Sequence, residues 1–325
     1  MSALRGLIVT CVSLDPSALT KDNIEKTMSA LLKQAVERID QTRGVAAQIF
    51  CSLLQNEPQI PHIPHRTELL TIFTPDIIAS VNWIKENETF PLFSQVLACD
   101  SYTSALMAGF IMSMGGMTER LVKYSVKHFL SFLKSQPSSK LLHICDIILH
   151  LFRKNTGNDD VTISMLIFLD KLFSSYVINT VLEDSHFEFC QEIFKLVKAE
   201  LNGCKNINKL KAGVEVYCQL LQFSSTRRSA LTRLLLYLTH SFAFLRKYAS
   251  LRLYETLMMF SSEFTEEGGM ISDDDLELSL KLLSETDWSD GKDKDRLKVA
   301  RDTLCGIYQV TLPLTRATVA VNTTA

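Results

Sequence analysis

The sequence predicts an all-α fold built from helical hairpins. Amphipathic periodicity recurs along almost the whole chain of 325 residues, and only 12 glycines and 8 prolines interrupt it. No series of segments shows the alternation of β-strands. The clearest hairpin is predicted over residues 227–257, with a turn near 241–243. Because such a hairpin cannot bury its apolar faces alone, we expect an α-solenoid of stacked HEAT- or armadillo-type helical hairpins.

Residues 1–56 are expected to form HEAT-like helical pairs. The segment 21–40 places apolar residues such as Ile24 and Met28 on one stripe at three- and four-residue spacing, which is the period of an amphipathic helix. A second helix is expected over 43–55, after almost no loop. Two helices joined this tightly are expected to be antiparallel neighbours.

Residues 57–92 are expected to be a connector that prolines interrupt. The string NEPQIPHIPHR at 56–66 contains three prolines, and Pro75 and Pro91 are expected to mark further breaks. Proline removes a backbone donor and restricts the residue before it to extended conformations. The connector is therefore predicted to be stiff and irregular, with short helices at most.

Residues 93–312 are expected to form one helical-repeat domain that no linker divides. Its helices are expected at 93–99, 102–114, 119–134, 140–153, 161–176, 185–201, 207–222, the hairpin 227–257, 271–283 and 296–310. Residues 313–325 are rich in Thr and Ala and have no pattern, so a disordered tail is predicted there.

The composition favours a cytoplasmic protein that does not bind nucleic acid. The net charge of −2 provides no basic excess for a phosphate backbone. The eight cysteines are scattered without a CxxC pair, which indicates a reducing compartment. The apolar run at the start is too short for a signal peptide. The uncharged segment 101–118 contains several hydroxyls and ends near two glycines, so we predict a buried helix and no membrane span.

Two short clusters of titratable residues were candidates for chemistry. His62 and His65 lie three residues apart, but their motif holds no Cys or carboxylate, and zinc needs three or four ligands. His143, Asp146 and His150 fit one face of a helix, yet the sequence does not supply the remaining ligands. We therefore predict no catalytic residue, no metal ligand and no cofactor-binding residue.

Seven strings are specific enough to compare with known families. They are LLKQAVERIDQTRGVAAQIFCSLL at 31–54, IPHIPHR at 60–66, SVNW at 80–83, MSMGGMTE at 112–119, KLKAGVEVYCQLLQFSSTRRSALTRLLLYL at 209–238, FLRKYASLRLYETL at 244–257 and LLSETDW at 282–288. In content and order they resemble the C-terminal region of the tubulin-folding cofactor D family. The proline connector and the Gly-Gly corner are the most specific, because a leucine-rich helix can match by chance.

The resemblance implies a non-catalytic, cytoplasmic and cytoskeleton-associated chaperone or scaffold. Implied partners are β-tubulin, the αβ-tubulin heterodimer, tubulin cofactors C and E, and an ADP-ribosylation-factor-like small GTPase. The implied roles are β-tubulin folding after the chaperonin, assembly or disassembly of the heterodimer, and support of GTPase activation of tubulin. Family members are several times longer, so the chain resembles a C-terminal fragment or short isoform.

Eight side chains are candidate partner contacts. They are His62, His65, Arg66, Trp83, Arg227, Arg228, Arg246 and Lys247. A basic ridge would steer association with acidic tubulin surfaces. The alternative is that the basic residues pair within the chain, for example with the acidic run 263–275. Two other functional interpretations stay open: a general HEAT-repeat adaptor unrelated to tubulin, and an enzyme with an unrecognised Cys–His or Asp–His site.

Overall fold

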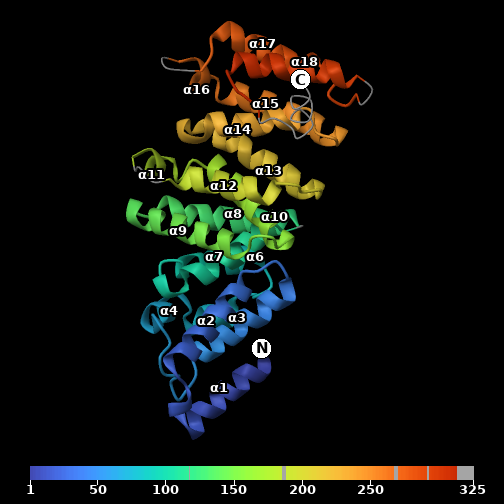
Figure 1. Ribbon diagram of the computed structural model, residues 1–325. Coiled ribbons are helices and arrows are strands. Elements are labelled where there is room, and N and C mark those ends of the chain that lie inside the picture. Colours follow the sequence, from blue (N-terminus) through green and yellow to red (C-terminus); the bar gives the residue numbers. More distant parts are fainter. Residues whose placement is uncertain (117, 185–187, 267–269, 291–292, 313–325) are drawn as a thin grey trace, which may run out of the picture. The chain divides into compact units, whose positions relative to one another are not determined.

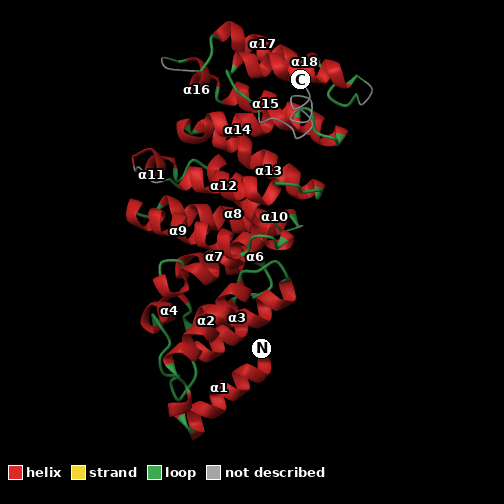
Figure 2. Cartoon of the chain, in the orientation of Figure 1, coloured by secondary structure: helices red, strands yellow, loops and turns green. Residues whose placement is uncertain are grey.

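The computed structural model describes residues 1–116, 118–184, 188–266, 270–290 and 293–312, and these residues form helices and loops without a strand (Figures 1 and 2). The predicted all-α class with stacked hairpins is confirmed. The chain divides into two compact units, Met1–Phe189 and Cys190–Ala325. The boundary falls inside the region 93–312, and the predicted tail 313–325 lies outside the described residues.

Unit 1 contains α1 (Ser2–Leu14), η1 (Pro16–Ala18), α2 (Lys21–Ala35), α3 (Asp40–Leu54), α4 (Arg66–Ile72), α5 (Pro75–Ser80), α6 (Glu86–Val96), α7 (Asp100–Met114), α8 (Glu119–Lys134), α9 (Ser138–Lys154), α10 (Asp159–Ser174) and α11 (Asn179–Asp184). Unit 2 contains α12 (Phe189–Leu201, which starts at the boundary), α13 (Ile207–Gln219), η2 (Leu220–Gln222), α14 (Ser224–Tyr237), α15 (Ala243–Met259), α16 (Ser261–Thr265), α17 (Asp273–Glu285) and α18 (Lys294–Ile307).

The first hairpin, α2–α3, follows from local signals. The Thr20 side chain accepts a hydrogen bond from the amide of Asn23 and starts α2. α2 ends at Ala35, earlier than the predicted 21–40, and the Ser113 hydroxyl donates to the freed Val36 carbonyl at 2.6 Å. α2 also packs against α7, where a Cβ on Gly109 would lie 2.4 Å from the Lys33 carbonyl oxygen. Glycine therefore lets these two backbones touch.

The connector is more helical than the sequence suggested. Pro75 occupies the first turn of α5, where its missing N–H costs nothing. Pro91, predicted to be a break, lies inside α6. That prediction was wrong because one missing N–H, one turn into a helix, frees a single carbonyl, and the packing of α6 on α4 and α8 holds the helix together.

Large aromatic side chains fill the core of unit 1 around the connector. Phe50, Phe73, Phe93 and Trp83 have ring centroids 5.3–6.4 Å apart. The predicted buried helix at 101–118 is confirmed as α7, which packs against α2, α8, α9 and α10. Among the described residues, none of the helices has both the length and the apolar character needed to cross a membrane.

Unit 2 is a stack of hairpins that share helix neighbours. α13 packs against α14 and α15, α15 packs against α17, and α14 packs against α18 (Figure 1). The predicted hairpin at 227–257 corresponds to α14 and α15, joined by residues 238–242. α17 starts with a capping box in which Ser272 and Asp275 satisfy each other's backbone amides.

Candidate protein-interaction surface

Arg246 joins three segments of unit 2. It lies at the start of α15 and is 5% exposed. Its guanidinium donates to five backbone carbonyls: those of His240 and Ser241 in the α14–α15 turn, and those of Trp288, Ser289 and Asp290 after α17. These bonds measure 2.8–3.3 Å. With its donors used in this way, Arg246 holds the turn and the later loop together and is removed from the surface candidates.

The paired arginines of α14 also make contacts within the chain. Arg227 forms an ion pair with Glu263 at 2.5 Å and donates to the carbonyl of Leu221 at 2.9 Å. Arg228 donates to the carbonyl of Gln309 at 2.7 Å. The expected pairing with the acidic run 263–275 therefore occurs at Arg227, although residues 267–269 of that run lie outside the described residues.

Lys247 is exposed on α15. The pKa of Asp287 is lowered mainly by hydrogen bonds from Ser289, and the Lys247 cation lowers it further. Among the described residues, the Lys247 side chain makes no hydrogen bond or ion pair, unlike Arg227, Arg228 and Arg246.

The candidates of the connector separate into core and surface. Trp83 is 6% exposed and packs on Phe73 and Phe93, so it belongs to the core. His62 is exposed with a φ of 62°, and His65 is half-buried with a φ of 52°. Histidine tolerates this left-handed region better than most residues.

A hydrogen bond and two buried side chains fix the loop that carries these histidines. The Tyr102 hydroxyl donates to the Pro64 carbonyl at 3.0 Å, and Ile60 and Ile63 are buried. Arg66 is half-buried at the start of α4. The connector therefore presents His62 on a fixed backbone, beside a half-buried His65 and Arg66.

A polar network between α13 and α15 is not predicted by the sequence pattern. The Tyr248 hydroxyl donates to one oxygen of Glu215, and Arg252 donates to the other at 2.9 Å through Nε. Burial and the bond to Glu215 raise the pKa of Tyr248. The Nζ of Lys211 lies 4.8 Å from the centroid of the Tyr248 ring and 5.5 Å from that of Phe244. The one sequence feature that points to a contact here is that the 244–257 helix carries apolar residues on both of its sides.

The clusters considered for chemistry do not converge. Within the described part of the chain, no group of three or more His, Cys, Asp or Glu side chains is placed to hold a metal ion. His143, Asp146 and His150 are exposed along α9, whereas Cys145 is buried. Burial raises the pKa of Cys145 and of Cys51 to about 12, so both thiols stay protonated and unreactive at neutral pH.

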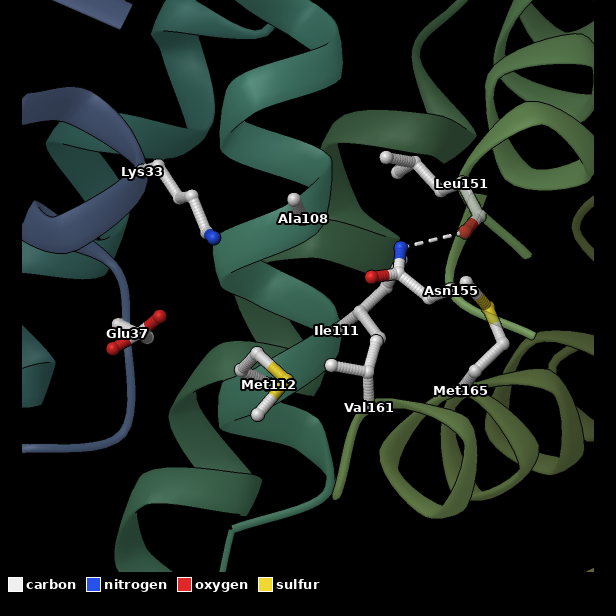
Figure 3. Close-up of a pocket in the computed structure, with 9 residues that line it drawn as sticks. All are labelled: Lys33, Glu37, Ala108, Ile111, Met112, Leu151, Asn155, Val161 and Met165. Carbon is white, nitrogen blue, oxygen red and sulfur yellow. Dashed lines mark hydrogen bonds between the residues drawn. The ribbon is translucent and has the colours of Figure 1, made fainter. Parts of the chain in front are cut away.

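A small cavity in unit 1 has a volume of about 110 Å³ (Figure 3). Its apolar wall consists of residues from α7, α9 and α10, including Ile111, Met112 and Met165. Lys33 and Glu37 line the opposite side, and the Asn155 amide donates to the Leu151 carbonyl at 2.8 Å. Pockets for cofactors and other small molecules usually have roughly 300–1,000 Å³. This cavity is too small for a nucleotide.

Stacked helical hairpins of this kind define the class of helical-repeat proteins. A sequence profile described as "Tubulin folding cofactor D C terminal" matches residues 25–209, more than half of the chain. The chain therefore belongs to the tubulin folding cofactor D family.

A curated relative, "Tubulin-specific chaperone D" of Dictyostelium discoideum, is 25% identical over 288 residues. The alignment covers 83% of this chain and 19% of the relative, so the chain spans about a fifth of that protein's length. No solved structure matches the chain.

Proposed function

We propose that this chain is a tubulin-binding scaffold that acts by contact and not by bond chemistry. The observation that supports this most directly is the family match over 25–209, combined with the name of the relative, a tubulin-specific chaperone. Stacked hairpins suit this role because each exposes one outward helix face to a partner.

The finer roles rest on the family resemblance. They are β-tubulin folding after the chaperonin, assembly or disassembly of the αβ-heterodimer, and support of GTPase activation of tubulin together with cofactors C and E. An ADP-ribosylation-factor-like small GTPase is a further partner in this proposal, and the location is the cytoplasm near the cytoskeleton. In the GTPase role, the nucleotide site would belong to tubulin, and this chain would hold the partners in place.

Four of the candidate contacts are at least partly accessible and fit this role. These are His62 on its fixed loop, Lys247 on α15, and the half-buried His65 and Arg66. Arg228 is exposed but already donates to Gln309, so its contribution is expected to be smaller. The proposal does not extend to Trp83, Arg227 or Arg246, whose side chains are engaged within the fold.

The test is retention of purified αβ-tubulin by the immobilised chain, with circular dichroism to verify its helices. We expect both tubulin subunits to be retained, and His62→Ala combined with Lys247→Ala to weaken retention. The matched control is Lys26→Ala, which removes an exposed charge that pairs with Asp22 on α2. A helical chain that retains neither subunit would contradict the proposal and leave the general adaptor interpretation.

A further inference from the structure

One outward face of α15 is largely apolar, with the exposed Glu255 as the charged residue within it. Phe244 and Leu251 are each 52% exposed, Met258 is 56% exposed and Met259 is 63% exposed. With the half-buried Tyr248, these side chains occupy an arc of about 100° at the helical period. We call these five residues the α15 stripe. It extends about 22 Å, or four turns, along the helix.

The opposite side of α15 carries apolar residues that are buried inside unit 2. Leu245, Ala249, Leu253 and Leu257 are buried against the neighbouring helices. Contiguous apolar surface exposed to water is unfavourable, so exposed apolar side chains on the outward side of the same helix indicate a contact surface. The neighbouring helices therefore cover one side of α15, and among the described residues of unit 2 the α15 stripe stays exposed.

α13 widens this surface. Lys211 contacts Phe244 and Tyr248, and Glu215, one turn later, contacts Tyr248 and Arg252. The two helices therefore run parallel, with residues 207, 211 and 215 of α13 beside the α15 stripe. Ile207 is a further exposed apolar residue at the same end as Phe244. The surface is thus two helices wide at its N-terminal end.

The charges on this surface are not balanced from end to end. Arg252 is matched by Glu215 and Glu255 in the middle of α15. Among the described residues, no carboxylate lies within ion-pair distance of Lys211, whose cation rests on the two rings. The N-terminal ends of α13 and α15 add partial positive charge at the same end. The N-terminal end is therefore cationic, and the end with Met258 and Met259 is apolar and adaptable.

We propose that the α15 stripe with α13 is the docking surface for an amphipathic helix of the tubulin client. That helix would place apolar residues along three to four turns and a carboxylate beside Lys211. The inference rests on the proposed tubulin function and assigns a surface to it. The partner helix is expected to carry a carboxylate at one end because Lys211 has no ion-pair partner among the described residues and the apolar stripe extends away from it.

The experiment measures the affinity of the chain for purified αβ-tubulin in four variants. Leu251→Glu combined with Met258→Glu places two charges on the stripe at exposed positions, and Lys211→Glu reverses the cation. Val299→Glu is the matched control, because Val299 is 66% exposed on α18 and lies outside the stripe. Leu251→Ser combined with Met258→Ser repeats the stripe test without added charge, in case the glutamates disturb folding.

We expect the double glutamate variant to weaken binding by at least about tenfold, as loss of a buried apolar anchor does at interfaces. Lys211→Glu is expected to weaken it less, by about threefold to tenfold, and more strongly at low salt. Val299→Glu is expected to stay within about twofold of the unmodified chain. Circular dichroism and thermal unfolding verify that each variant is folded.

The outcomes separate the two proposals. If the unmodified chain binds tubulin and the stripe variants bind equally well, the docking surface is wrong and the tubulin function stands. If the unmodified, folded chain does not bind tubulin, the proposed function fails and this inference fails with it. A chain that is dimeric by light scattering and becomes monomeric in the stripe variants would assign the stripe to a second copy and overturn the inference.

Discussion

Among the described residues, each unit buries one arginine, and the two arginines have different surroundings. Arg43 in unit 1 has its guanidinium 2.9 Å from the Asp40 carboxylate and 3.6 Å from that of Glu86, and it also donates to the carbonyls of Glu37 and Ile84. Among the described residues, the acceptors of Arg246 in unit 2 are all backbone carbonyl oxygens. In one unit the charge is neutralised by other charges, and in the other it is solvated by backbone dipoles.

Arg43 and Arg246 therefore stabilise different features of their units. Glu86 is shared, since Arg120 also contacts it at 3.0 Å, so unit 1 can lose one cation and keep that carboxylate paired. The carbonyls around Arg246 belong to two loops, the α14–α15 turn and residues 288–290, and Arg246 is the group that joins them. Unit 2 should therefore depend more on its arginine than unit 1 does.

The largest effect is expected for Arg246→Met, which keeps the length of the side chain and removes its donors. Five carbonyls then lose a charged partner in a buried site, and we expect the free energy of unfolding to fall by about 4 kcal/mol. Urea unfolding followed by circular dichroism measures the change. Arg296→Met, an exposed arginine of α18, is the control and should change stability by under about 0.5 kcal/mol.

A smaller loss is expected for Arg43→Met. Glu86 keeps its contact with Arg120 and Asp40 is largely exposed, so we expect the free energy of unfolding to fall by about 2 kcal/mol. The same unfolding measurement applies, with exposed Arg38→Met as the control. An equal loss in the two arginine variants would show that carboxylate and carbonyl environments are equivalent here, and the comparison would fail.

The smallest effect concerns pH and the turn that Arg246 clamps. Burial, and then the Arg246 cation, lower the pKa of His240, whose Nδ1 accepts from the Phe242 amide at 3.1 Å. An unfolded histidine titrates near 6.5, so the unfolded chain binds more protons below that pH. The stabilisation is full above about pH 6.5 and is lost as the pH falls through the lower folded pKa.

His240→Asn isolates this contribution, because asparagine retains an acceptor but does not titrate. We expect the unmodified chain to lose more stability than the variant between pH 7.5 and pH 5.5, as measured by urea unfolding at each pH. Other titrating groups, including His128, are present in both chains and cancel in the difference. A variant that loses as much stability as the unmodified chain would exclude a role for His240.

The sequence was sufficient for the fold because helical periodicity is a local property. The hairpin at 227–257 follows from its helical pattern, and the buried helix at 101–118 follows from an uncharged run with hydroxyls that ends near two glycines. The role of Arg246 could not be predicted, because its acceptors lie up to 44 residues further along the chain. Trp83 was expected at the surface, and its burial depends on Phe73 and Phe93, which the fold brings to it. By contrast, the α15 stripe is a local pattern that could be predicted from the residues between 244 and 259.

The two tryptophans of the chain provide one optical reporter for each unit. Trp83 lies in the aromatic core of unit 1, and Trp288 is buried in unit 2, where its indole N–H donates to the Leu283 carbonyl at 2.9 Å. Trp83→Phe leaves emission from unit 2 alone, and Trp288→Phe leaves emission from unit 1 alone. Since the Trp288 carbonyl also accepts from Arg246, its fluorescence would follow the opening of that clamp directly.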